Sequence, residues 1–145
     1  MIVYCDTSAL LKLYVDEAHT PSVEALLTRS EAVSVCRIAW AEAQAALARR
    51  LREQPDAATA IATARSALAR DWPAYVVIEV SQAVVELAGD YADSFALRGY
   101  DAVQLAACAS FAREVCLPVH FACFDQRLNK AARVLGLEVP FIDLS

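Results

Sequence analysis

Short apolar runs recur along the chain, and residues with helical spacing follow most of them. The first run, from Ile2 to Cys5, does not alternate with polar residues and ends at Asp6. This pattern is typical of a buried parallel strand whose carboxyl end opens into a site. Four later runs share this character and predict strands at 32–36, 75–80, 119–124 and 139–142. The last run contains Pro140, which predicts an edge strand.

Between the strands, apolar residues spaced three and four apart predict helices at 9–15, 19–30, 37–53, 57–70, 81–97, 102–113 and 126–135. Pro55 separates the third helix from the fourth, so these two are expected to form a hairpin, with Asp56 as a cap. The helix at 102–113 is apolar nearly all round, which predicts that it is buried. Because strands and helices alternate, the sequence predicts an α/β fold with a mostly parallel central sheet of about five strands and helices on both faces.

Length and charge limit the kind of protein. A chain of 145 residues fits a single domain, residues 1–145, with one substantial core. The net charge of −5 argues against a protein that coats nucleic acid with Lys and Arg, but not against a nuclease whose carboxylates hold a cation. The longest stretch without charged residues, 102–112, is far shorter than the ~20 residues of a membrane span.

Cysteine usage indicates the compartment. The five cysteines are odd in number and include no C-x-x-C pair, so the sequence predicts neither a disulfide framework nor a zinc site. Charged residues, the first of them Asp6, interrupt the amino-terminal apolar run, so no signal peptide is expected. We therefore expect a cytoplasmic protein with no membrane partner.

Four acidic residues are the candidates for chemistry. Asp6 and Asp125 each end a predicted strand, so both are expected at the carboxyl edge of the sheet, where ligands gather in open α/β sheets. Asp101 begins the buried helix and Glu42 lies in the helix after the second strand, so both can reach the same edge. Two ionised carboxylates ~5 Å apart repel by about 3 kcal/mol at an effective dielectric constant of ~20. A cluster of four therefore needs a cation or must take up protons.

Each acid also has a purely structural interpretation. Asp6 is a good helix N-cap, and Asp101 with Gln104 resembles a capping box. Taken by itself, Glu42 is better explained as a solvated helix acid paired with a nearby Arg. Cap and ligand can coexist, because a carboxylate has two oxygens, so the residues alone leave both interpretations open.

If the acids converge, their donor atoms are all oxygens, which favours Mg²⁺ or Mn²⁺. Such ions serve phosphate chemistry, because they can activate a water for attack at phosphorus. Ser8, two residues after Asp6, has a hydroxyl placed to hydrogen-bond a ligand carboxylate or a scissile phosphate. The residues therefore favour metal-dependent hydrolysis of a phosphodiester.

Three segments together resemble the PIN-domain family, specifically its VapC-type toxins. They are 3–10 (Val-Tyr-Cys-Asp-Thr-Ser-Ala-Leu), 97–106 (Leu-Arg-Gly-Tyr-Asp-Ala-Val-Gln-Leu-Ala) and 124–128 (Phe-Asp-Gln-Arg-Leu), with the helix acid Glu42 between the first two. The resemblance runs in order over essentially the whole chain. Gln104 stands where many relatives have His, a departure that leaves the four acids intact.

This resemblance implies a three-layer α/β/α fold and an endoribonuclease that depends on Mg²⁺, for which Mn²⁺ can substitute. It also implies an RNA substrate, a VapB-like antitoxin encoded alongside and a homodimer, with the hairpin at 37–70 assigned to antitoxin and dimer contacts. Asn129, one helical turn beyond Asp125, occupies a place where a further polar or acidic group is sometimes found. By position, the catalytic and metal-binding acids would be Asp6, Glu42, Asp101 and Asp125, with Ser8 as the accompanying catalytic hydroxyl.

Two other functions compete with this hypothesis. One is a catalytically inactive PIN-like module that binds protein and whose acids only cap helices. The other is a different metal-dependent phosphohydrolase, of the haloacid-dehalogenase kind, which needs a second Asp where this chain has Ser8. The three glycines are isolated and form no phosphate-binding loop, so an ATPase or dinucleotide enzyme is not indicated.

Overall fold

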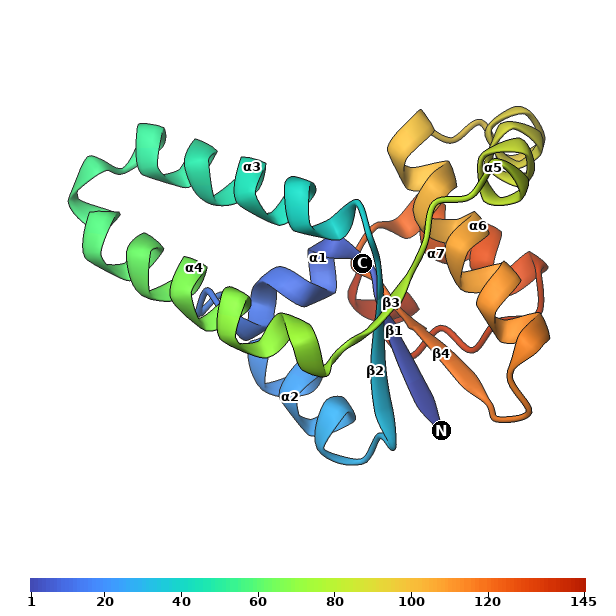
Figure 1. Ribbon diagram of the computed structural model, residues 1–145, viewed down its shortest axis with the longest axis horizontal. Coiled ribbons are helices and arrows are strands. Elements are labelled where there is room, and N and C mark those ends of the chain that lie inside the picture. The colour runs from blue at the N-terminus through green and yellow to red at the C-terminus, as the bar shows by residue number, and fades with distance from the viewer.

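Four strands form a parallel sheet at the centre of the computed structural model, which describes residues 1–145 (Figure 1). They are β1 (Ile2–Cys5), β2 (Ala32–Cys36), β3 (Val76–Ile78) and β4 (Val119–Ala122), in the spatial order β3-β2-β1-β4. All three pairings are parallel, and Tyr4 of β1 stands opposite Ser34 on one side and Phe121 on the other. The predicted α/β fold with a parallel sheet is therefore confirmed, with four strands instead of about five.

The prediction of a fifth strand at 139–142 is wrong. Only Glu138 joins the sheet, in a single bridge to His120 of β4, and its carbonyl oxygen accepts a hydrogen bond of 2.8 Å from Phe121 N. Pro140 has no N–H to extend such a ladder. The chain instead turns into a 3₁₀ helix at Ile142–Leu144.

Helices cover both faces of the sheet. On one face lie α1 (Thr7–Leu10), α2 (Thr20–Thr28), α3 (Ala39–Glu53) and α4 (Ala58–Asp71), and on the other lie α5 (Gln82–Phe95), α6 (Gly99–Glu114) and α7 (Gln126–Val134) (Figure 1). Side chains of β1 alternate between the two faces, with Tyr4 in the core under α5 to α7 and Val3 in the core under α1 to α4. The molecule thus has three layers, α/β/α.

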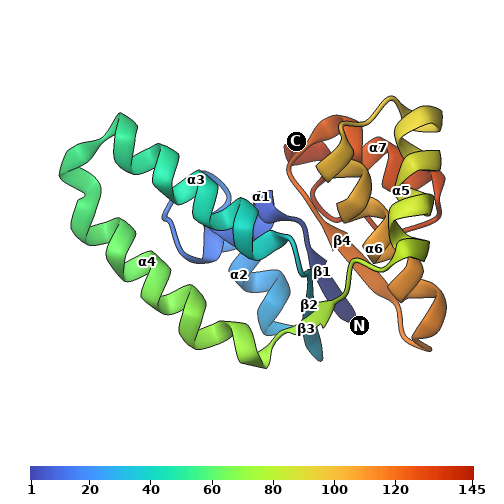
Figure 2. The same cartoon turned by 45° about the horizontal axis from the view of Figure 1, so that its top comes forward.

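The hairpin of α3 and α4 extends well beyond the sheet (Figure 2). Its outer half has a small core of its own, made by Leu47, Ile61 and Ala64. Between the two helices, a 3₁₀ turn at Pro55–Ala57 replaces the cap predicted for Asp56, which makes no side-chain cap hydrogen bond. The hairpin is therefore confirmed, but its turn is held by backbone geometry and Pro55.

The start of α6 also differs from the prediction. The helix begins at Gly99 and its N-cap is Arg98, whose backbone is extended, so Asp101 lies inside the first turn. The interpretation of Asp101 and Gln104 as a capping box is therefore wrong. The preceding helix α5 ends at Phe95, and its C-cap Ala96 is in the left-handed conformation, which leaves room for only a short extended link before α6. This early start turns the carboxylate of Asp101 away from capping and leaves it available for other contacts.

Candidate active site

All four candidate acids lie near the carboxyl ends of the strands. Asp6 directly follows β1, and Asp125 follows β4, its parallel neighbour. Glu42 is in the first turn of α3, which follows β2, and Asp101 is in the first turn of α6. The topology therefore brings residues from four separate segments to one edge of the sheet, where open α/β sheets bind ligands.

Asp6 is the most buried of the four, with 6% of its surface exposed. Its Oδ2 accepts hydrogen bonds from Ser8 Oγ at 2.8 Å and Ser8 N at 3.3 Å, and from the thiol of Cys123 at 3.5 Å. Burial raises the pKa of Asp6 to about 6; the Ser8 hydroxyl opposes this rise and the charge of Glu42 adds to it. Asp6 thus caps α1, as the structural interpretation predicts, and is also a carboxylate with an elevated pKa.

Glu42 is held by two hydrogen bonds to the same oxygen. Thr7 Oγ1 donates to Glu42 Oε1 at 3.0 Å, and Gln104 Nε2 donates to it at 2.7 Å. Burial raises the pKa of Glu42, the two hydrogen bonds lower it, and the charge of Asp101 raises it. Glu42 takes part in no salt bridge, so the alternative of a solvated acid paired with an Arg is wrong.

Asp101 and Asp125 are more accessible. Burial raises the pKa of Asp101, the charge of Asp125 raises it further, and the charge of Arg98 lowers it. Asp125 is exposed and is the N-cap of α7, with its Oδ1 accepting a hydrogen bond of 2.8 Å from Leu128 N. One oxygen of Asp125 is therefore used by the helix and the other is available.

Electrostatic effects link the four acids in a chain. Glu42 raises the pKa of Asp6, Asp101 raises that of Glu42, and Asp125 raises that of Asp101. As the side chains stand, no group of three or more His, Cys, Asp or Glu residues is arranged to hold a metal ion. The donor set nonetheless fits a hard divalent cation, because its available atoms are carboxylate oxygens whose mutual repulsion a cation would offset.

Asn129 adds one further oxygen near these acids. Its Nδ2 donates to the backbone oxygen of Cys123 at 2.8 Å, while its Oδ1 is buried without a partner. A buried amide oxygen without a partner commonly accepts from a water or meets an ion. The fully buried Asn129 is thus explained in part: it ties α7 to the end of β4 and leaves one acceptor free.

Sequence reasoning missed the contacts that three residues make in the site. Gln104, fully buried, joins β1 to α3: Tyr4 OH donates to its Oε1 at 2.7 Å, while its Nε2 donates to Glu42. Thr7 bonds Glu42, and Cys123, interpreted from the sequence as core only, contacts Asp6 and accepts from Asp125 N at 3.2 Å. The sequence signal that could have identified Thr7 and Gln104 was their closeness to the candidate acids. Thr7 adjoins Asp6, and Gln104 lies three residues after Asp101.

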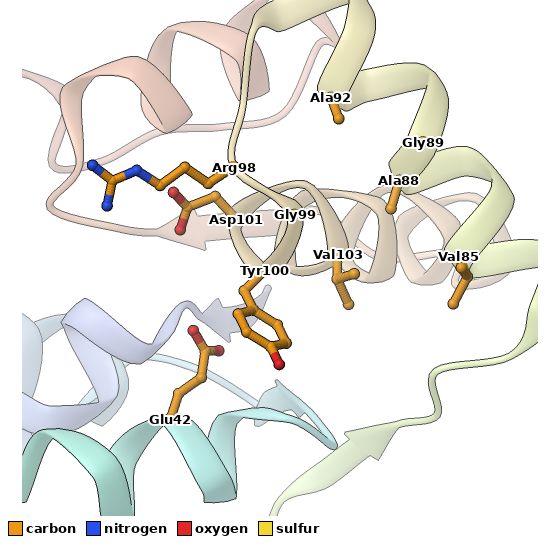
Figure 3. A pocket seen from close by; sticks show the side chains of 10 residues that line it. All are labelled: Glu42, Val85, Ala88, Gly89, Ala92, Arg98, Gly99, Tyr100, Asp101 and Val103. Carbon is orange, nitrogen blue, oxygen red and sulfur yellow. The ribbon is translucent and has the colours of Figure 1, made fainter.

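A cavity of about 600 Å³ opens beside the acids (Figure 3). Glu42 and Asp101 line it on one side, together with Arg98 and Tyr100. Small or apolar residues of α5 and α6 line the rest, among them Ala88, Gly89, Ala92 and Val103. Two of the four candidate acids, Glu42 and Asp101, therefore face a hollow large enough for a substrate.

Comparisons with known proteins agree with this fold. Residues 3–134 match the PIN domain family. The chain belongs to the PIN-domain family. Within it, the chain is 32% identical to ribonuclease VapC45 and to ribonuclease VapC49, both of Mycobacterium tuberculosis, over 138 residues that make up 95% of this chain and 94% of each relative.

Solved structures share the fold at low sequence identity. VapBC2 from Rickettsia felis, bound to a DNA fragment from their promoter, matches with a TM-score of 0.64 and 14% identity over 96% of this chain and 97% of that chain. A toxin–antitoxin complex from Klebsiella pneumoniae matches with a TM-score of 0.55 and 18% identity over 86% of this chain and 87% of that chain. No helix of the present structure has the length and apolar character needed to span a membrane.

Proposed function

We propose that this protein is a metal-dependent endoribonuclease and the toxin of a VapBC-type toxin–antitoxin pair. The observation that carries the proposal is the convergence of Asp6, Glu42, Asp101 and Asp125 at one edge of the sheet, each electrostatically coupled to the next. Membership of the PIN-domain family and 32% identity to two proteins named ribonucleases support RNA as the substrate.

In this proposal the four acids hold Mg²⁺ or Mn²⁺, and Ser8 orients the carboxylate of Asp6. A divalent cation supplies positive charge for the phosphate and lowers the pKa of a water that attacks phosphorus. The chain's own part is to position the acids. Ser8 fixes Oδ2 of Asp6, and Thr7 and Gln104 fix Oε1 of Glu42, so each of these two carboxylates keeps its other oxygen for a ligand.

We further propose that a VapB-like antitoxin and a second copy of the chain bind the protein. One structural neighbour is described as a toxin–antitoxin complex and the other as VapBC2, which supports an antitoxin partner. The hairpin of α3 and α4 projects away from the sheet and leaves long helix faces uncovered, which suits a protein contact (Figure 2). The oligomeric state is measured directly by light scattering of the antitoxin-free protein.

The test of the nuclease uses protein purified free of antitoxin and total bacterial RNA. We expect cleavage with Mg²⁺ or Mn²⁺ and none with EDTA. Asp101→Asn should slow cleavage by at least about 100-fold, because removing a ligand charge costs several kcal/mol of transition-state stabilisation. Asp90→Asn, an exposed acid of α5 outside the site, is the matched control and should cleave like the parent.

The second candidate function, an inactive protein-binding module, has one observation in its favour: Asp6 and Asp125 do cap helices. It predicts no cleavage under any metal condition and no Mn²⁺ binding in calorimetry. Equal cleavage by the parent protein and Asp101→Asn would also contradict the proposed mechanism, because the charge of Asp101 would then have no part in the reaction.

A further inference from the structure

The side chain of Tyr100 is unusually exposed for an aromatic residue next to a candidate active site. It is 70% exposed, whereas Trp40, the other aromatic residue among the exposed large hydrophobic side chains, is 36% exposed. Tyr100 makes no side-chain hydrogen bond and no aromatic pair in the described chain. Its ring therefore contributes little to the stability of the fold and is available for a ligand.

The ring borders two hollows that share one of the candidate acids, Glu42. One is the cavity of about 600 Å³ between α5, α6 and Glu42, and the second, of about 500 Å³, is lined by Ile38, Ala41, Glu42, Ala45 and Tyr100. Glu42 and Tyr100 line both. Figure 3 shows the ring of Tyr100 projecting toward Glu42, with Asp101, the next residue in the chain, above it. Anything that covers this ring lies beside the carboxylates.

A positively charged side chain, that of Arg98, also lies beside these carboxylates. The side chain of Arg98 runs beside Asp101 in Figure 3 and lines the first cavity. Arg98 is exposed and makes no salt bridge, so its guanidinium can bind a phosphate. A free guanidinium, an aromatic face and one acid thus lie within four consecutive residues of the chain, Arg98 to Asp101.

We infer that Tyr100 is a stacking platform for an unpaired nucleobase of the RNA, next to the phosphate that is cut. The inference rests on the proposed ribonuclease function and adds a substrate-binding residue to it. Single-stranded RNA is commonly bound by stacking of splayed bases on exposed aromatic rings, and Arg contacts the backbone. The small, apolar residues that line the first cavity, such as Ala88 and Val103, leave space for a base on the ring.

The charge of the whole chain supports a base contact. With 13 Lys and Arg against 18 Asp and Glu, the protein has little general attraction for phosphates. Affinity for RNA must then come from local contacts and from the cation that the acids would hold. Stacking on Tyr100 supplies such a contact without positive charge, and it works with any base because every base has a π-face.

The test measures RNA binding in the presence of EDTA, so that no cleavage occurs. The probes are a single-stranded RNA of ten adenosines, the same RNA with 2-aminopurine at its centre, and an abasic ribose-phosphate chain of equal length. The proteins are the parent, Tyr100→Ala, Tyr100→Phe and the control Val134→Ala, which removes a 74% exposed side chain at the end of α7. Since Tyr100 is mostly exposed, its variants are expected to fold, which circular dichroism checks.

We expect Tyr100→Ala to bind the adenosine RNA about tenfold more weakly than the parent, and Tyr100→Phe and Val134→Ala to bind it like the parent. The parent should quench 2-aminopurine fluorescence and Tyr100→Ala should not. The abasic chain should bind the parent and Tyr100→Ala equally. Unchanged affinity of Tyr100→Ala for the adenosine RNA would overturn the inference, as would equal losses in Tyr100→Ala and Tyr100→Phe, which would assign the contact to the hydroxyl.

Failure of this inference is distinguishable from failure of the proposed function. If the parent cleaves RNA with Mn²⁺ but Tyr100→Ala binds the adenosine RNA like the parent, only the stacking role is lost. If Tyr100→Ala keeps RNA affinity but no longer binds an antitoxin, the ring is a protein contact and the inference is overturned. If the parent quenches 2-aminopurine but cleaves no RNA, the stacking role stands and the nuclease does not.

Discussion

The residue that organises the site is Gln104, although it carries no charge. It is fully buried, its Oε1 accepts from Tyr4 OH, and its Nε2 donates to both Glu42 and Thr7. Such a buried network fixes its members only while every group has a partner. Gln104 is therefore a positioning residue that acts through Glu42.

Replacing Gln104 with Met, which has a similar shape but no amide, tests this role. The change leaves the hydroxyl of Tyr4 buried without an acceptor and removes one hydrogen bond from Glu42. We expect the free energy of unfolding in urea to fall by about 2–3 kcal/mol. In the parent, the hydrogen bond from Gln104 lowers the pKa of Glu42. Its loss should therefore raise that pKa and shift the pH profile of RNA cleavage upward.

The control for this change is Gln82→Met, at the exposed start of α5, which should alter neither stability nor the pH profile. A Gln104→Met protein that is destabilised but keeps the parent's pH profile would reduce Gln104 to a structural residue. If neither quantity changes, the network itself is without effect.

At the scale of elements, apolar runs predicted the strands well because three of the four are mostly buried. The bounds of β1 and β2 agree with the prediction, and β4 is shorter by two residues. Prediction failed where one residue decided the outcome. Pro140 has no N–H with which to continue a fifth strand, and the short link after Ala96 places the start of α6 at Gly99.

The contacts within the site could not be predicted from the sequence, for a different reason. Periodicity shows which face of a helix is buried but not which residue it meets. Tyr4 and Gln104 are separated by 100 positions, and Gln104 and Glu42 by 62, so only the tertiary structure brings these side chains together. The four acids could be predicted to share an edge, because that follows from the order of strands and helices.

The two roles of Asp125, as the cap of α7 and as a candidate catalytic acid, can be tested separately. Its Oδ1 accepts from Leu128 N, and an Asn at this position retains the cap while losing the charge. We expect Asp125→Asn to unfold like the parent and Asp125→Ala to lose about 1 kcal/mol. Both should slow RNA cleavage to a similar extent if the charge of Asp125 serves the reaction.

Stability is measured by urea unfolding and cleavage by the same RNA assay for both variants. Normal cleavage by Asp125→Asn, together with impaired cleavage by Asp125→Ala, would mean that Asp125 matters only as a cap. In that case the carboxylate would leave the candidate catalytic set.

The molecule as a whole concentrates negative charge without salt bridges at one edge of its sheet. None of the four candidate acids takes part in a salt bridge, whereas six ion pairs lie elsewhere. Three of the four have raised pKa values, with burial as the largest cause. Without a cation, ionisation of these groups therefore opposes folding.

This cost predicts how global stability changes with pH. The pKa of Asp6 is about 6 in the folded protein and 3.8 for the free side chain, so the folded state binds the proton more tightly. The free energy of unfolding contributed by Asp6 is therefore fully present below pH ~4 and is lost as pH rises to ~6, about 3 kcal/mol in all. Glu42 and Asp101 change stability in the same direction.

The measurement is urea unfolding from pH 4 to pH 7 in EDTA, for the parent and for Asp6→Asn, which cannot titrate at this position. The difference in stability should grow in favour of Asp6→Asn as pH rises, while the control Asp90→Asn follows the parent. At pH 7, Mn²⁺ at 100 times its dissociation constant should stabilise the parent by about 2.7 kcal/mol. Asp6→Asn should gain less from Mn²⁺. A parallel pH dependence of the two proteins, with no effect of Mn²⁺ on either, would mean that this edge is neither strained by its charges nor built for a cation.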